Sequence, residues 1–303
     1  MATRSCLRII KLERREVRVL GYRQAAKYMI RMGSIMTTDQ TVLVTGAAGR
    51  VGSFLRSRLQ RSGRKLRLLD TEPLQPLAEN EEVVVASITD MTSMQSACSG
   101  VDSVIHLAGE ASEADWSRIL ELNIHGTYTV LEAARREGVQ RLIYASSNHA
   151  VGFFPREKAP AADYLFPQPD TYYGVSKVTG EALGSLYHDR YGLDVICIRI
   201  LTCIERPSDL RMLSTWLSPD DTGRLFEACL RVEKPGFRVI WGVSANKRGW
   251  FSLDEAESIG YKSEDDAEDY AAELIAKFGE LDPTSISYRL LGGAFCSEEF
   301  NVD

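Results

Sequence analysis

The sequence predicts an α/β fold, in which helices cover both faces of a mostly parallel sheet. Two observations carry this prediction. From Thr41 onward, short apolar runs alternate with longer amphipathic segments, which is typical of stacked βαβ units. A glycine-rich turn over 46–52 separates the first apolar run from the first amphipathic segment, as in a strand–turn–helix unit.

The predicted elements follow this alternation in order. Strands are expected at the short apolar runs, and helices where apolar residues recur with a helical period. The expected strands are Thr41–Thr45, Lys65–Asp70, Glu82–Ala86, Val101–Leu107, Arg141–Ser146 and Leu193–Ile200. The expected helices are Val51–Gln60, Asp115–Arg136 and Tyr173–Tyr191, and a proline-rich loop is expected over 152–171.

After about residue 200 the alternation loosens, and the C-terminal part is expected to be less regular. Ser218 followed by Pro219 predicts a capped helix start. Ser263, followed by three acidic residues, predicts a second start of the same kind. The expected organisation is a doubly wound core of the Rossmann type over 37–200, with a smaller C-terminal cap over 201–303 that interleaves with it.

The first 36 residues differ in charge from the rest of the chain. They hold nine Arg or Lys residues against Glu13 and Glu16, whereas the whole chain has a formal net charge of −6. An organelle transit peptide is also basic and arginine-rich. The two glutamates and the lack of a serine-rich stretch favour an upstream extension instead, with Met36 as the natural start. We expect a cytoplasmic protein whose fold excludes residues 1–36.

Composition argues against several classes of function. A pI near 5.5 argues against a nucleic-acid partner. No stretch approaches the ~18 uninterrupted apolar residues that a membrane-spanning helix needs. Six scattered cysteines without a C-x-x-C pair, together with only four histidines, predict neither a disulfide framework nor a metal site, and they fit a reducing compartment.

The turn over 46–52, GAAGRVG, has the spacing of a dinucleotide-binding loop. Gly46 would make the tight turn, Gly49 would let the backbone approach a pyrophosphate, and Gly52 would allow close helix packing. The alternative is a merely structural turn, which the strand before it and the helix after it disfavour. Asp70 ends the second strand, where a carboxylate would accept hydrogen bonds from ribose hydroxyls and repel a 2′-phosphate. NAD is therefore predicted in preference to NADP.

Tyr173 and Lys177 are the candidate catalytic pair. Their spacing puts both side chains on one face of a helix, where the ammonium is expected to lower the pKa of the phenol. Such a pair arises often by chance, but here it accompanies a dinucleotide loop. Ser146 and Ser147 end the fifth strand at the carboxyl edge of the sheet, where ligands bind in open α/β folds.

Together these motifs resemble the extended short-chain dehydrogenase/reductases, the superfamily of the NAD-dependent epimerases and dehydratases. Within it, the chain is similar to uronate dehydrogenases, which oxidise galacturonate or glucuronate at the anomeric carbon to an aldarolactone. The resemblance covers Thr41 to about Phe295. It is carried by TGAAGRVG at 45–52, HLAG at 106–109, NIHGTY at 123–128, YASSNH at 144–149, YGVSK at 173–177, IRILTC at 198–203, DLRMLSTWLS at 209–218 and GVSAN at 242–246.

The resemblance implies a catalytic role for three residues. Tyr173 would take the proton from the anomeric hydroxyl, and Ser147 would hydrogen-bond the reacting oxygen. Lys177 would bind the nicotinamide ribose. The implied cofactor contacts are Gly46, Gly49, Arg50, Val51, Gly52, Asp70, Ser87, Ile88, Leu107, Ala108, Gly109, Asn123 and Lys177.

The resemblance also implies how a sugar acid would be held. Asn148 and His149 would bind ring hydroxyls, and Arg211 would clamp the carboxylate with its bidentate fork. Thr202 keeps a hydroxyl where the family pattern has serine. The implied substrate contacts are Ser112, Ser147, Asn148, His149, Tyr173, Thr202 and Arg211.

Several of these residues have structural alternatives. His149 could pack or bond the backbone at a strand end, and Arg211 could be a solvated surface residue. His106 is expected to be a core histidine, and Trp216 and Trp241 are expected to be packing residues.

Two positions depart from the family pattern. Ala111 stands where the pattern has a substrate-contacting serine, with Ser112 one place along. Ser87 stands where the superfamily commonly has an aspartate for the adenine. The departure at Ala111 leaves the preferred sugar open, because it removes a substrate hydrogen bond.

Three other functions compete with uronate oxidation. A sugar-nucleotide epimerase or dehydratase would use the same tyrosine and lysine, but it needs a larger C-terminal domain than the 92 residues after Arg211 provide. A neutral aldose dehydrogenase is favoured if Arg211 does not face the substrate. A non-catalytic NAD-binding protein is disfavoured by the intact Ser147, Tyr173 and Lys177. The expected small-molecule partner is a sugar acid, and the superfamily resemblance implies a second copy of the chain, bound through the two long helices.

Overall fold

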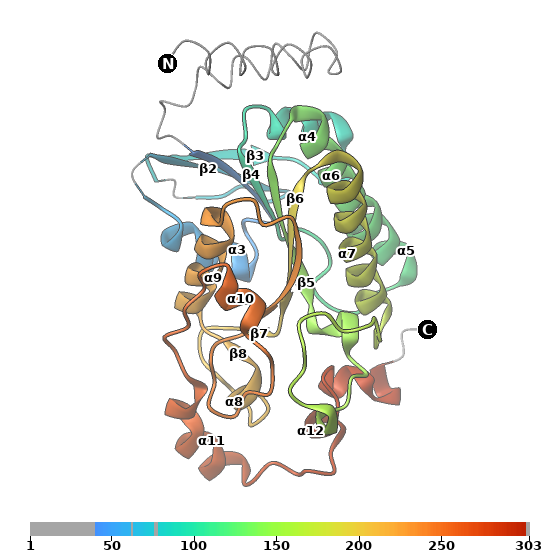
Figure 1. Ribbon diagram of the computed structural model, residues 1–303, viewed down its shortest axis with the longest axis vertical. Coiled ribbons are helices and arrows are strands. Elements are labelled where there is room, and N and C mark those ends of the chain that lie inside the picture. Colours follow the sequence, from blue (N-terminus) through green and yellow to red (C-terminus); the bar gives the residue numbers. More distant parts are fainter. Residues whose placement is uncertain (1–39, 62, 76–77, 301–303) are drawn as a thin grey trace, which may run out of the picture. The chain divides into compact units, whose positions relative to one another are not determined.

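The computed structural model describes residues 40–61, 63–75 and 78–300. The predicted N-terminal extension, residues 1–36, lies outside the described residues. Residues 40–300 form a seven-stranded parallel sheet between two layers of helices (Figure 1). This confirms the predicted α/β class with a doubly wound parallel sheet.

The sheet has the strand order β3-β2-β1-β4-β5-β6-β9, and each neighbouring pair is parallel. The order reverses between β1 and β4, and ligands of such sheets bind at this switch point, outside the carboxyl ends of the strands. All six predicted strands are present, and β9 is a seventh that the sequence did not predict. The strands are β1 (Gln40–Thr45), β2 (Arg64–Asp70), β3 (Glu81–Val85), β4 (Ser103–His106), β5 (Arg141–Ser147), β6 (Asp194–Ile200) and β9 (Phe237–Gly242).

The helices alternate with the strands as expected, with one addition, α4, between β3 and β4. The longer helices are α3 (Arg50–Arg58), α4 (Met91–Cys98), α6 (Gly126–Glu137), α7 (Tyr172–Tyr191), α9 (Pro219–Arg231) and α11 (Ala271–Phe278). Shorter elements are α5 (Trp116–Arg118), β7 (Thr202–Cys203), α8 (Met212–Thr215), β8 (Trp216–Leu217), α10 (Asp254–Ser258) and α12 (Ile286–Arg289). None of the described helices is both long and apolar enough to cross a membrane.

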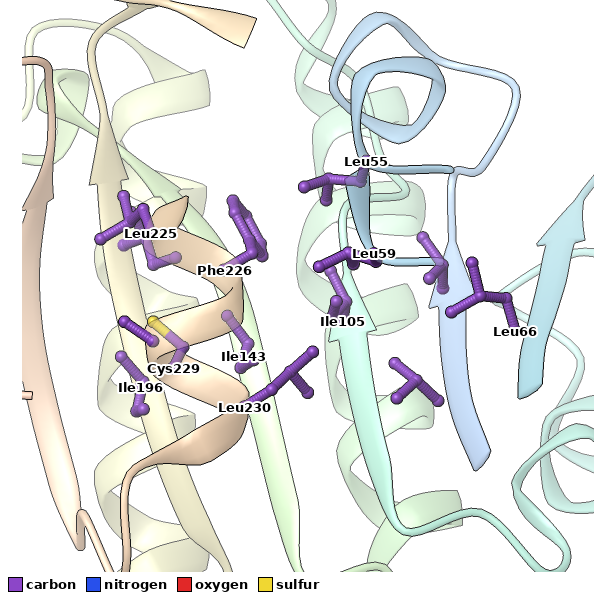
Figure 2. Packing of buried hydrophobic residues seen from close by; sticks show 14 of the residues in the cluster. Leu55, Leu59, Leu66, Ile105, Ile143, Ile196, Leu225, Phe226, Cys229 and Leu230 are labelled. Carbon is purple, nitrogen blue, oxygen red and sulfur yellow. The ribbon is translucent and has the colours of Figure 1, made fainter. Parts of the chain in front are cut away.

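Apolar side chains fill both faces of the sheet. On one face, Leu55 of α3 and Phe226 of α9 pack in one cluster with strand residues such as Ile143 (Figure 2). On the other face, Met94 of α4 and Tyr187 of α7 belong to a second cluster. Because helices cover both faces, the strands are buried on both sides, which explains why they read as nearly continuous apolar runs.

The predicted helix Asp115–Arg136 is continuous but changes its winding. α5 leads into a π-helical segment, η1 (Ile119–His125), which leads into α6. π-Helical turns are rare and occur frequently at functional sites. This one carries the buried Asn123.

The structure confirms one of the two predicted helix starts in the C-terminal part. Ser218 caps α9, and its Oγ accepts a hydrogen bond from the Asp221 backbone N at 2.8 Å. The prediction for Ser263 was wrong. Its Oγ donates to the Asp221 carboxylate at 2.6 Å, and the next helical turn begins at Ala267 with Asp266 as its cap. The cause is Asp221, whose buried carboxylate needs donors and binds the Ser263 hydroxyl.

Short elements lie beyond the carboxyl ends of the strands, where Figure 1 shows β7, β8, α8, α11 and α12. The chain then returns toward the sheet: Leu291 N donates to Phe154 O at 3.0 Å, and Gly292 N donates to Gly152 O at 2.8 Å. These bonds hold the C-terminal segment against the loop that follows β5. The predicted division near residue 200 stays a prediction, and β9 shows that later residues also complete the sheet.

Candidate active site

A cavity of about 1340 Å³ opens at the carboxyl ends of the strands. It is lined by the glycine loop, the end of β2, the loop after β4, the end of β5, the start of α7 and the C-terminal cap. Asn123 is the one predicted site residue outside its lining. The predicted residues that line it are Gly46, Gly49, Arg50, Val51, Gly52, Asp70, Ser87, Ile88, Leu107, Ala108, Gly109, Ser112, Ser147, Asn148, His149, Tyr173, Lys177, Thr202 and Arg211.

The glycine loop has the shape that a dinucleotide's phosphates need. Gly46 has a positive φ of 70°, and a Cβ there would lie 2.7 Å from the Ala108 backbone N. A Cβ on Gly52 would lie 2.6 Å from the Gly46 carbonyl O, so neither position accepts a side chain. α3 begins after Gly49 with no side-chain cap, which leaves its first N–H groups available to an anion. The loop therefore fits the pyrophosphate of NAD.

Asp70 lies at the end of β2, on the edge of the cavity. Its Oδ2 accepts a hydrogen bond from the Ala48 N at 2.9 Å, which joins β2 to the glycine loop. The carboxylate is thereby fixed where it favours ribose hydroxyls over a 2′-phosphate. No Lys or Arg occurs in 71–80 to offset its charge. This arrangement fits NAD rather than NADP.

Tyr173 and Lys177 are buried on the first two turns of α7. The Lys177 Nζ lies 5.2 Å from the centroid of the Tyr173 ring and donates to the Ala145 O at 2.8 Å. Burial raises the pKa of Tyr173 to about 12, partly offset by a hydrogen bond with Ser147. Burial lowers the pKa of Lys177 to about 8.

The predicted net lowering of the tyrosine pKa was therefore wrong for the protein alone. Transfer of the Tyr173 phenol out of water disfavours its charged form, and this effect is larger than any stabilisation of the phenolate by nearby groups. The group that does lower the tyrosine pKa is the Ser147 hydroxyl. A further positive charge in the cavity would favour the phenolate.

Ser147, Asn148 and His149 follow one another where β5 ends. The Ser147 Oγ accepts a hydrogen bond from the His149 N at 3.2 Å, and the Asn148 Nδ2 donates to the Leu291 O at 3.2 Å. The His149 Nδ1 lies 2.7 Å from Oδ2 of Asp170. The ring of His149 thus binds a carboxylate, rather than the backbone as the alternative had it.

Arg211 lies on the cavity wall just before α8. Its Nη2 donates to the Leu291 O at 2.6 Å. Burial lowers the pKa of this guanidinium, so Arg211 is not a solvated surface residue. Of the acidic side chains that the structure describes, none forms an ion pair with it, and Asp209 and Asp170 act on it only at longer range. A desolvated guanidinium without a carboxylate partner favours an anionic ligand.

Asn123 has a different environment from the one predicted. Its Oδ1 accepts from the Glu110 N at 2.7 Å, and its Nδ2 donates to the Glu110 O at 3.0 Å and to the Ser176 Oγ at 3.1 Å. These bonds connect the π-helical segment to the loop after β4 and to α7. The side chain thus holds a cavity-lining loop in place without lining the cavity itself.

Three further residues lie beside the site and were not predicted from the sequence. The Glu113 carboxylate accepts hydrogen bonds from the first N–H groups of α7, including the Tyr173 N at 2.7 Å. The ring of Phe295 lies 4.1 Å from the ring of His149 between centroids. Asp170, which binds His149, is the third. None had a signal of its own, because acidic residues near a helix start and a single aromatic residue near a C-terminus are common.

Three residues that were expected to be structural are so. Nδ1 of His106 lies 2.8 Å from Oγ1 of Thr45, and burial lowers the pKa of His106 to about 3. Trp216 and Trp241 are buried in apolar clusters. Within the described part of the chain, no group of three or more His, Cys, Asp or Glu residues could hold a metal ion.

The NAD dependent epimerase/dehydratase family matches residues 42–217. This stretch contains the glycine loop, Tyr173, Lys177 and Arg211, and it is more than half of the chain. The chain belongs to this family. NAD is thus the cofactor that both the family and the geometry of the cavity indicate.

Several family members are similar to this chain over most of its length. A uronate dehydrogenase from Pseudomonas putida is 40% identical over 264 residues, which are 86% of this chain and 97% of that protein. An NAD-dependent glucose-6-phosphate dehydrogenase from Haloferax volcanii is 38% identical, over 78% of this chain and 97% of that one. A mutant uronate dehydrogenase from Agrobacterium tumefaciens, solved in complex with NAD, has a TM-score of 0.81 at 38% identity, over 85% of this chain and 97% of that structure.

Proposed function

We propose that this chain catalyses the NAD-dependent oxidation of a hexuronate, galacturonate or glucuronate, at its anomeric carbon, and releases an aldarolactone. The observation that carries the proposal is Arg211, a desolvated guanidinium without an acidic partner in the described chain, in the same cavity as Tyr173. A uronate carries a carboxylate on C5, which is joined to the anomeric carbon through the ring oxygen, so an anion-binding group must lie near the base. The uronate dehydrogenases among the relatives support this substrate class.

NAD would be held along the carboxyl ends of β1 to β4. The pyrophosphate would bind the N–H groups after Gly49, the ribose hydroxyls would bind Asp70, and Lys177 would bind the nicotinamide ribose. When bound, NAD supplies the acceptor for the hydride that leaves the anomeric carbon. The further proposed cofactor contacts are Gly46, Arg50, Val51, Gly52, Ser87, Ile88, Leu107, Ala108 and Gly109.

Tyr173 would take the proton of the anomeric hydroxyl, so that the carbon–oxygen bond becomes a carbonyl and the closed ring becomes a lactone. Ser147 would hydrogen-bond the same oxygen, and its existing bond to Tyr173 supports this placement. The raised pKa of Tyr173 means that the phenolate must be favoured at the moment of reaction by positive charge nearby. Lys177, whose Nζ is 5.2 Å from the tyrosine ring, provides such a charge when protonated.

The sugar ring would be oriented by polar groups around Tyr173. Asn148 and His149 would bind ring hydroxyls, and Thr202 would add a hydroxyl from β7. Ala111 and Ser112 both line the cavity, so Ser112 is available to replace the hydrogen bond that Ala111 cannot make. Arg211 would bind the carboxylate through two parallel N–H groups.

The test is turnover of defined sugars by the purified protein with NAD. Galacturonate or glucuronate should generate NADH, and the product should be an aldarolactone by NMR. The proposal is overturned if neither acid is oxidised while galactose, arabinose or glucose 6-phosphate is. NAD that stays bound through turnover without net NADH would instead indicate an epimerase.

We also propose that two copies of the chain associate through α5–α6 and α7. Large apolar side chains are exposed along these helices, and Trp116 and Tyr172 contact one another with ring centroids 5.4 Å apart. Large apolar side chains that are exposed along neighbouring helices support an interaction surface there. The exposed members are Trp116, Leu120, Tyr128, Tyr172, Val175, Leu186 and Tyr191.

A further inference from the structure

We propose that Asp170 is a positioning residue: it holds His149 as the tautomer with hydrogen on Nδ1, so that the opposite nitrogen, Nε2, accepts a hydrogen bond from a substrate hydroxyl. The proposal deepens the proposed function and rests on it for the identity of the ligand. It assigns a role to a residue that the sequence analysis did not single out.

The hydrogen bond between the two side chains determines the tautomer. The His149 Nδ1 lies 2.7 Å from the Oδ2 of Asp170, and the Asp170 side chain is fully buried. An ionised carboxylate only accepts hydrogen bonds, so the hydrogen between the two atoms belongs to Nδ1. In a neutral imidazole the other nitrogen then carries no hydrogen and is an acceptor.

The Asp170 carboxylate has room in the fold because two neighbouring positions, 152 and 292, are glycines without side chains. A Cβ on Gly152 or on Gly292 would lie 1.9 Å from the Asp170 Oδ2. The backbones of these two glycines are joined by the bond from Gly292 N to Gly152 O, at 2.8 Å. The second carboxylate oxygen, Oδ1, accepts from the Thr171 Oγ1 at 3.0 Å. The carboxylate is therefore fixed at both oxygens.

The His149 ring is fixed on its other sides by aromatic groups. The ring of Phe295 lies 4.1 Å away between centroids, tilted by 33°, and the ring of Tyr173 lies edge-on at 5.7 Å. Among the described residues, Nε2 has no hydrogen-bond partner, although His149 lines the cavity. The remaining polar atom of the ring is thus available to a ligand beside the proposed base.

This arrangement has a chemical consequence for recognition. A neutral His149 with a bare Nε2 binds a hydroxyl that donates, and that hydroxyl oxygen remains free to accept from another group. A reversed tautomer would present a donor instead, and the hydroxyl would have to turn its own hydrogen elsewhere. Asp170 thereby determines which hydrogen-bonding pattern the sugar ring must match.

The first test observes the tautomer and needs no substrate. The chain has four histidines, so the ring nitrogens of a ¹⁵N-histidine-labelled sample can be assigned by comparison with His149→Gln. At a pH where the rings are neutral, His149 should show a protonated Nδ1 and a bare Nε2. A protonated Nε2 in the wild type overturns the proposal, and this result does not depend on whether uronates are the substrate.

The second test uses Asp170→Asn, which keeps the shape of the side chain. Because Thr171 donates to Oδ1, the new amide NH₂ faces His149, and the tautomer should reverse in the same NMR experiment. With galacturonate, kcat/KM should fall by about 10- to 100-fold, mainly through KM, with unchanged NADH affinity. An unchanged tautomer, or an unchanged kcat/KM, contradicts the proposal.

Two controls separate positioning from a general loss of structure. Asp163 is another buried aspartate, bound to Ser252 at 2.8 Å and outside the cavity lining, so Asp163→Asn should leave KM unchanged. In a His149→Gln background, Asp170→Asn should cost less than about 3-fold, because residues that act through one another are not additive. A loss as large as in the wild-type background would show that Asp170 does not act through His149.

Discussion

Burial governs the ionisable side chains of the site. It raises the pKa of Tyr173 to about 12 and lowers that of Lys177 to about 8, and it also lowers the pKa of Arg211. Burial therefore disfavours the charged form of each side chain, and it is the charged form that would act as a base in Tyr173 or as a cation in Lys177 and Arg211. The cavity thus has groups that are poised to exchange protons or to gain an anionic partner.

The depressed pKa of Lys177 predicts that Lys177→Met stabilises the fold. The lysine pKa falls from 10.5 in the unfolded chain to about 8 in the folded one, so a charged Lys177 destabilises the protein at neutral pH. At pH 7 the variant should have a higher free energy of unfolding by roughly 1–3 kcal/mol, measured with urea. Between pH 8 and 10.5 the unfolded chain binds more protons, the wild type gains stability, and the difference should shrink. A difference that grows with pH would contradict the assignment.

Residue types and spacing were sufficient to predict the core of the cofactor and catalytic site, and the family resemblance supplied most of the other predicted cavity residues. The glycine loop, Asp70 and the Tyr173/Lys177 pair each have a recognisable spacing in the sequence with a known chemical purpose. All of them line the same cavity. Asp170 and Phe295 could not be predicted, because their roles arise from contacts with His149 across the fold. The direction of the tyrosine pKa was also wrong, since spacing along a helix does not reveal burial.

At the scale of elements, the helix start at Ser263 and the strand β9 were predicted wrongly or missed. In both cases tertiary contacts, rather than the local sequence, determine the structure. Ser263 has every local feature of a helix cap, but Asp221 binds its hydroxyl. β9 follows a segment without clear periodicity, and its pairing with β6 places it in the sheet. The helix over 115–136 was predicted correctly in extent, while its π-helical segment has no known signature in sequence.

The strand–turn–helix unit of β1 and α3 predicts the effect of Gly52→Ala. The added Cβ would lie 2.6 Å from the Gly46 carbonyl, so the loop must shift away from the first turn of α3. NADH affinity should fall by at least about 10-fold, and stability should fall by about 1–3 kcal/mol. Fluorescence titration and urea unfolding measure the two effects.

The matched control is Gly138→Ala at the end of α6. Gly138 has a positive φ of 73° with open space around it, so the variant should lose stability by about 1 kcal/mol. It lies outside the cavity lining, and NADH affinity should not change. Equal loss of NADH affinity in both variants would show that the effect of Gly52→Ala is only instability.

At the scale of the whole molecule, one cavity lies between the carboxyl edge of the sheet and a less regular C-terminal cap. The cap contributes Arg211. The segment over 290–292 contributes the Leu291 carbonyl, which accepts hydrogen bonds from both Arg211 and Asn148. The sheet was predictable because its periodic patterns are strong. The path of the cap was not, since it depends on single backbone hydrogen bonds such as those of residues 290–292.

The exposed apolar face of α6 and α7 predicts a dimer in solution. Charged side chains on this face should prevent association, because they would be buried without partners. The double variant Tyr128→Glu with Leu186→Glu should therefore be a monomer by light scattering. Phe166, which is 87% exposed on a loop, provides the control, and Phe166→Glu should remain a dimer. A wild-type chain that is monomeric at high concentration contradicts the proposed interface.

The most direct test of the central claim is the response of sugar selectivity to Arg211→Gln. This guanidinium is desolvated, is held by the Leu291 carbonyl and lies on the wall of the same cavity as Tyr173. If it binds the substrate carboxylate, kcat/KM for galacturonate should fall by at least about 100-fold. The affinity for NADH and the turnover of galactose should change by less than about 3-fold. An unchanged kcat/KM for galacturonate, or an equal loss for both sugars, would contradict the claim that this site recognises a uronate.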